Sequence, residues 1–139
     1  MVNITINNLQ KKLPIPKMRI KNLVLKILKG EGLNSSGYIN ICFTDNPLIK
    51  KLNTKFLKTN SATDVLAFNL GDKKANRLIL ADIVISTDSA ISNARNFKTT
   101  SREELLLYVA HGVLHILGFN DHTKAQIQLM RKKENKYVN

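Results

Sequence analysis

Apolar residues recur along the chain with two spacings, one typical of strands and one typical of helices. Short runs with alternating or continuous apolar residues occupy residues 2–6, 38–44, 64–70 and 78–86 and predict four strands. Apolar residues three and four positions apart occupy residues 17–29 and 48–56 and predict two amphipathic helices. Thr87 is the expected cap of a further helix that runs to Phe97. This order of segments predicts an α+β fold, a single domain over residues 1–139 in which helices cover one mixed sheet of about four strands.

The stretch that follows Ser101 is predicted to be a buried helix. Ser101 with Glu104 three residues later is a capping-box pattern that indicates where this helix begins, and Gly118 indicates where it ends. Thr123 with Gln126 repeats the capping box and predicts a last helix. The apolar stripe of the buried helix consists of Leu105, Val109, Gly112 and Ile116, and it is widened by Leu106, Ala110, Val113 and Leu117.

Two of the three histidines of the chain, His111 and His115, lie four positions apart in this helix. Residues with that spacing are one helical turn apart, so both imidazoles can point at one metal ion. The turn after Gly118 contains Asp121 and His122 and can add a third ligand. Three protein ligands with a fourth position left open are typical of catalytic zinc sites. The alternative is a pair of histidines that are only hydrogen-bonded.

The residue after the first histidine argues against a peptidase. In the HExxH pattern of zinc peptidases that residue is a glutamate that serves as general base, whereas here it is Gly112. Asp82, inside an otherwise apolar strand, must be hydrogen-bonded or paired if it is buried, and it either stabilises the core or supports the metal site. Thr63 and Asp64, at the start of another strand, have the same two interpretations.

The net charge and the absence of certain sequence patterns favour some classes of protein and disfavour others. The formal net charge of +12 favours a nucleic-acid partner, although an AT-rich genome would also enrich lysine, which outnumbers arginine 17 to 5. No apolar run approaches the ~20 residues of a membrane span, and the N-terminus does not resemble a signal peptide, so we expect a cytoplasmic protein without a membrane partner. The single cysteine, Cys42, is expected to be a small buried thiol. No glycine-rich phosphate loop is present, which disfavours a nucleotide cofactor.

Three segments carry a distinctive pattern, HGVLHILGFNDH, residues 52–68 and residues 78–86. They resemble, in this order, the signature HGxLHxxGxDH, the segment LNxxYRxxxxPTDVLSF and the strand LGDIxIS of the YbeY family of bacterial metal-dependent endoribonucleases. The chain departs from these patterns at four positions, which are Leu57 in place of an arginine, Ala62 in place of Pro, Ala81 in place of Gly, and the additional Asn120. The arginine is thought to assist catalysis in the family, so Leu57 argues against a mechanism that depends on it.

The resemblance implies a single-strand-specific, zinc-dependent endoribonuclease with one zinc ion per chain. It further implies a role in ribosomal RNA processing, 16S rRNA 3′ end maturation and ribosome quality control, with single-stranded RNA and small-subunit particles as partners. In the family pattern the third histidine stands six residues after the second, and that position here is Asp121. The expected metal ligands are therefore His111, His115 and Asp121, with His122 as the alternative third ligand. A different metal-dependent hydrolase and a non-enzymatic ribosome-assembly factor with a structural zinc remain the competing hypotheses.

Overall fold

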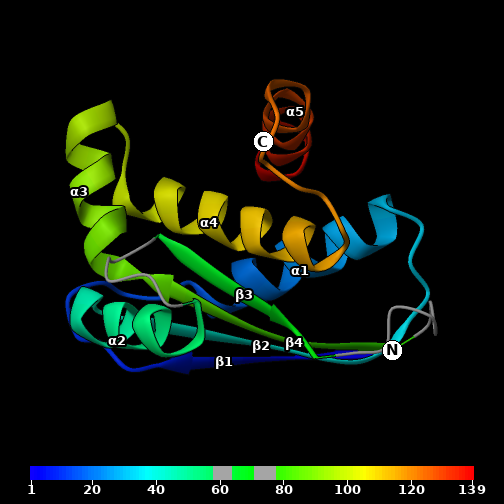
Figure 1. The fold of residues 1–139 in the computed structure, drawn as a ribbon, viewed down its shortest axis with the longest axis horizontal. Helices are drawn as coiled ribbons and strands as arrows, with labels where there is room; N and C mark the ends of the chain where they lie inside the picture. Colours follow the sequence, from blue (N-terminus) through cyan, green and yellow to red (C-terminus); the bar gives the residue numbers. More distant parts are fainter. Residues whose placement is uncertain (58–63, 71–77) are drawn as a thin grey trace.

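A computed structural model describes residues 1–57, 64–70 and 78–139, which form one α+β unit built on a four-stranded mixed sheet (Figure 1). The strands are β1 (Val2–Asn8), β2 (Ser36–Thr44), β3 (Val65–Asn69) and β4 (Leu78–Ser86), in the spatial order β1-β2-β4-β3. β1, β2 and β4 are parallel, and β3 pairs antiparallel with β4. The predicted α+β fold with one mixed sheet is confirmed. The predicted loop at 58–62, Thr63 and the turn at 71–76 lie outside the described residues.

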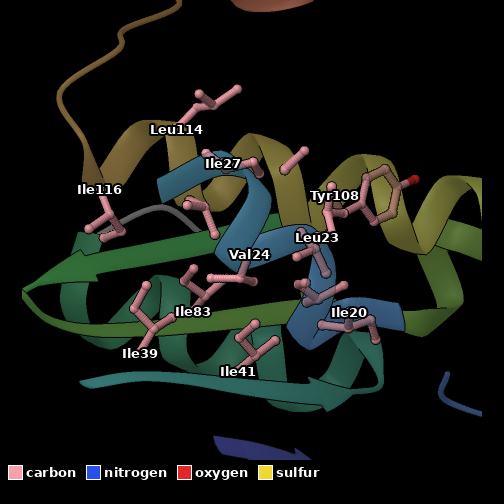
Figure 2. Packing of buried hydrophobic residues seen from close by; sticks show 14 of the residues in the cluster. Ile20, Leu23, Val24, Ile27, Ile39, Ile41, Ile83, Tyr108, Leu114 and Ile116 are labelled. Carbon is pink, nitrogen blue, oxygen red and sulfur yellow. The ribbon is translucent and has the colours of Figure 1, made fainter. Parts of the chain in front are cut away.

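Helices cover the two faces of the sheet unequally. α1 (Lys17–Gly30) and α4 (Ser101–Ile116) pack together on one face, and α2 (Asn46–Leu57) packs on the other (Figure 1). α3 (Thr87–Phe97) follows β4 directly, and α5 (Lys124–Val138) packs on α4. Figure 2 shows the main core, in which α1 side chains such as Val24 meet Ile41 and Ile83 of the sheet. The smaller cluster under α2 is built around Ile49, Leu66 and Val84.

α4 is buried on several sides because it contacts β3, β4, α1, α3 and α5. It approaches the sheet closely at Gly112, where an added Cβ atom would lie 2.9 Å from Cγ2 of Ile83 and 3.2 Å from Cγ1 of Val65. The position that a peptidase uses for a glutamate therefore faces the sheet and has no room for a side chain. The geometry agrees with the argument from sequence against a peptidase.

Two helix caps were predicted one residue too late. The N-cap of α4 is Thr100, whose Oγ1 accepts a hydrogen bond from the backbone N–H of Glu103, and Ser101 is the first helical residue. The N-cap of α3 is Ser86, whose Oγ accepts from the N–H of Ser89, while Thr87 lies inside the helix. Neighbouring hydroxyl residues have similar capping propensity, and the extended backbone at Thr100 and Ser86 decides between them. The capping box of Thr123 with Gln126 is confirmed at α5.

Asp82 supports the sheet and not the candidate metal site. Its side chain accepts a hydrogen bond from Nδ2 of Asn40 at 3.0 Å, and Ile83, the next residue of β4, is the one that faces α4. Because side chains alternate along a strand, Asp82 lies on the opposite face. Cys42 is half-buried beside the smaller cluster, where burial raises the pKa of its thiol. In the described part of the chain, no helix has the length and apolar character needed to cross a bilayer.

Candidate metal centre

Three side chains from α4 and the turn after it converge on one point. Nε2 of His111 and Nε2 of His115 are 3.0 Å apart, and Oδ2 of Asp121 lies 3.4 Å from each of them. Atoms bound tetrahedrally to zinc at about 2.0–2.2 Å lie roughly 3.3–3.6 Å from one another, so the group has nearly the spacing that zinc requires. These three residues form the group of potential metal ligands among the described residues.

Hydrogen bonds at both ends fix the turn between α4 and α5 in position. At the end of α4, Gly118 takes a left-handed conformation with φ of 102°, and its N–H donates to the carbonyl of His115. The N–H of Phe119 donates to the carbonyl of Leu114, which completes a Schellman motif. At the start of α5, Oε1 of Gln126 accepts hydrogen bonds from the N–H groups of His122 and Thr123. With both ends held, the short segment between them carries Asp121 back over the two histidines.

The hydrogen bonds to Gln126 also explain why Asp121 and His122, the two candidate third ligands, occupy different positions. The backbone of His122 belongs to the capping box of α5, and its side chain is exposed. His122 is not part of the group formed by His111, His115 and Asp121. The structure therefore brings Asp121 to the histidine pair and leaves His122 outside it, and the role of Asp121 as a ligand remains a prediction that this placement supports.

Glu134 lies behind His111 and is the site residue that the sequence analysis missed. Its Oε2 atom is 3.4 Å from Nδ1 of His111, and Glu134 as a whole is only 8% exposed. A carboxylate at Nδ1 favours the tautomer that carries its proton there, which leaves Nε2 free as a ligand atom. A signal was present in the sequence, because Glu134 interrupts the stripe of α5 that buries Met130 and Tyr137.

The electrostatics of His111 favour a cation at this point. Burial by itself lowers the pKa of His111, but the side chain of Glu134 and the charges of Asp121 and Asp64 outweigh it and raise that pKa. When Nδ1 carries the proton, the lone pair of Nε2 points at the carboxylate of Asp121 and at the other imidazole. That arrangement is repulsive unless a proton or a metal ion lies between the groups. A plain hydrogen bond between the histidines explains their 3.0 Å contact but not the carboxylate placed against both of them.

A cavity of about 590 Å³ opens beside the cluster. Its walls include three carboxylates with different surroundings: Asp121 in the ligand group, Glu134 against His111, and the exposed Asp64 at the start of β3. The hydroxyl of Tyr108 is held by Asn93 and by the carbonyl of Ser89, and burial raises the pKa of Tyr108. The remaining walls are formed by Val65, Leu107, His111, Arg131 and Asn135. Each imidazole of the histidine pair keeps 27% of its side chain exposed, so solvent reaches both rings.

Comparison with known proteins gives matches along almost the whole chain. The family model described as Endoribonuclease YbeY matches residues 5–139. A relative with that description from Carboxydothermus hydrogenoformans is 32% identical over 136 residues, which cover 96% of this chain and 93% of the relative. Another from Syntrophus aciditrophicus is 34% identical over 136 residues, covering 94% and 84%. The solution structure of TM1509 from Thermotoga maritima has a TM-score of 0.63 and 29% identity, and the match covers 99% of this chain and 87% of that one.

Proposed function

We propose that this chain, which belongs to the endoribonuclease YbeY family, is a zinc-dependent endoribonuclease that cleaves single-stranded RNA during ribosomal RNA processing. Family membership supports RNA cleavage as the reaction class. The single observation that carries the metal dependence is the convergence of His111, His115 and Asp121 at separations of 3.0–3.4 Å beside an open cavity.

The residues present suit zinc better than magnesium or calcium. Two imidazole nitrogens and one carboxylate oxygen form a common ligand set for zinc, whereas magnesium and calcium prefer oxygen ligands. When bound, zinc supplies a Lewis acid for a phosphate oxygen and lowers the pKa of a coordinated water. The protein holds the ligand atoms in place and fixes the tautomer of His111 through Glu134.

Asp64 is the carboxylate of the cavity best placed to act as a general base. Asp121 belongs to the ligand group and Glu134 is buried against His111, whereas Asp64 is exposed at the cavity and belongs to neither arrangement. We assign to Asp64 the removal of the proton that the attacking water loses as it adds to phosphorus, while the bond from phosphorus to a ribose oxygen breaks and that oxygen takes up a proton from solvent. This assignment supplies the base that Gly112 cannot provide.

The wider setting follows from the family and from the charge. We propose that residues 1–139 act as one endoribonuclease domain in the cytoplasm. Its partners are single-stranded ribosomal RNA and small-subunit particles, and its role is 16S rRNA 3′ end maturation and ribosome quality control. The net charge of +12 favours binding to RNA phosphates. No membrane partner or nucleotide cofactor is expected.

The test is a cleavage assay with purified protein on single-stranded and duplex RNA of the same sequence. We expect cleavage of the single strand, loss of cleavage after chelation, and recovery with about one equivalent of added zinc. Asp64→Asn should retain zinc and lower kcat by about 10²–10⁴-fold, the usual contribution of a general base. A zinc-loaded wild type that binds RNA but cleaves neither substrate would favour the alternative, an assembly factor with a structural zinc.

A further inference from the structure

The cavity beside the metal centre has an unbalanced set of charges. Asp64, Asp121 and Glu134 line it, and among the described residues that do so Arg131 is the only lysine or arginine. A doubly charged zinc ion held by neutral imidazoles leaves one of the three negative charges in excess. The phosphodiester that must enter this space is itself negative, so like-charge repulsion would oppose binding unless a protein cation lies there. Arg131 cancels the remaining charge.

Of the consecutive basic residues at 131–133, only Arg131 lies on the face of α5 that lines the cavity. Arg131, Glu134 and Asn135 all line the cavity, because residues three and four apart lie on one side of a helix. The neighbouring lysines point elsewhere.

Lys133 forms a salt bridge with Glu31 at 2.9 Å and lies 5.3 Å from the ring centroid of Phe119. Lys136 lies over the ring of Tyr137. Lys132 is exposed and is not part of the cavity wall. The arginine and not one of these lysines therefore faces the site.

We propose that Arg131 is a substrate-binding residue whose guanidinium contacts the phosphate of single-stranded RNA that lies next to the metal ion. The inference rests on the proposed endoribonuclease function and adds to it the protein group that receives the phosphate. A planar guanidinium donates two parallel hydrogen bonds to phosphate oxygens, which an ammonium group cannot reproduce. Arg131 therefore orients the phosphodiester as well as neutralising it.

The test compares Arg131→Gln, Arg131→Lys and the matched control Lys132→Gln, which removes the same charge from the adjacent position of α5. Each zinc-loaded protein is measured for zinc content, cleavage of a single-stranded oligoribonucleotide, and the salt dependence of binding to a non-cleavable single-stranded analogue. We expect kcat/KM to fall about tenfold to hundredfold in Arg131→Gln, the usual effect of losing a charged hydrogen bond. Arg131→Lys should recover part of the affinity but less of kcat, and Lys132→Gln should stay within about twofold of wild type, as expected of an exposed surface charge. Zinc content should be equal in all four proteins.

The salt dependence separates a direct phosphate contact from a general loss of charge. Arg131→Gln should reduce the log–log slope by about 0.7, the value for one phosphate contact on a single strand, and Lys132→Gln should change it less. Equal effects of the two glutamine variants on kcat/KM and on the slope would overturn the assignment of Arg131. If the wild type does not cleave the single strand, the proposed function is wrong. The difference in salt-dependence slope between Arg131→Gln and Lys132→Gln would still show whether Arg131 contacts an RNA phosphate.

Discussion

Two faces of α4 differ in the side chains that they carry: one is apolar and packs on the sheet, and the other carries the two histidines. Val109, Gly112 and Ile116 belong to the stripe that meets the sheet, where the approach at Gly112 leaves no space for a side chain. His111 and His115 belong to the face directed toward α5 and the turn, where they meet Asp121 and keep 27% of their side chains exposed. Adjacent positions 111 and 112 thus belong to different parts of the molecule, the candidate metal centre and the packed core.

The comparison shows that one face of a helix can provide the packing that holds it, which leaves polar side chains on another face available to bind a ligand. The sheet-facing residues anchor α4 by dense apolar packing, so the histidines need not contribute to stability. A rigid helix also holds two imidazoles at a fixed separation, which lowers the entropy lost when a metal ion binds. Substitutions on one face should therefore change zinc binding, and substitutions on the other should change the free energy of unfolding.

Removal of either histidine should have the largest effect. We expect His111→Ala and His115→Ala each to reduce retained zinc from about one equivalent per chain to almost none, because two remaining protein ligands bind zinc weakly. Elemental analysis after dialysis measures this. In the metal-free state His115→Ala should melt close to the metal-free wild type, since this imidazole is outside the apolar core. His111→Ala should melt lower, because it leaves the buried carboxylate of Glu134 without the imidazole that it faces. Equal zinc content in wild type and both variants would end the metal-site hypothesis.

The second prediction concerns the turn. Asp121→Ala should lose zinc almost as completely as the histidine variants, because its carboxylate is the third atom of the cluster. His122→Ala is the matched control, since it alters the adjacent exposed residue and leaves the backbone hydrogen bond to Gln126 in place. Zinc competition titrations compare the two proteins. Tight zinc in Asp121→Ala together with lost zinc in His122→Ala would reverse the assignment.

Glu134 connects the metal-binding face of α4 to α5 and should have an intermediate effect. Glu134→Gln keeps the shape of the side chain but removes the charge at Nδ1 of His111, so zinc affinity should fall about tenfold to hundredfold. Glu103→Gln, an exposed change in the first turn of α4, serves as the control. Nitrogen NMR of the imidazoles should show a smaller share of the Nδ1-protonated tautomer of His111 in Glu134→Gln. An unchanged zinc affinity would make Glu134 a purely structural residue.

Gly112→Ala should produce the opposite pattern, a loss of stability with zinc retained. The new Cβ would lie 2.9 Å from Cγ2 of Ile83, an atom close to the backbone that cannot move far. Overpacking costs about 1–3 kcal/mol, and the better helix propensity of alanine offsets about 1 kcal/mol of that, so we expect a net loss of up to roughly 2 kcal/mol.

Chemical denaturation measures the effect, and a double-mutant cycle with Ile83→Ala tests its cause. Truncation of Ile83 removes both close contacts to that residue. The double variant should therefore lose less stability than the sum of the two single variants. Strict additivity would show that the cost of Gly112→Ala arises elsewhere.

The sequence by itself determined most of the fold and, in the candidate site, the histidine pair and the bend after it. Apolar spacing predicted the four strands and the helices, since burial of one face is a local requirement written into each segment. The spacing of His111 and His115 and the glycine at position 118 also predicted the metal pair and the bend, because both depend on helix geometry alone. The caps were misplaced by one residue where two hydroxyl residues stood side by side and local propensity could not choose between them.

Tertiary structure decided which distant residues complete the site. Glu134 and Arg131 reach the cavity only because α5 packs across α4, and Asp64 reaches it because β3 lies beside the same helix. The position of Asp121, and not His122, beside the two histidines depends on hydrogen bonds that close both ends of one turn, at Gly118 and at Gln126. Hydrophobic pattern and local propensity depend on a few neighbouring residues. Whether a side chain points toward a residue far away in the sequence depends on how whole helices and strands pack, and no single segment contains that information.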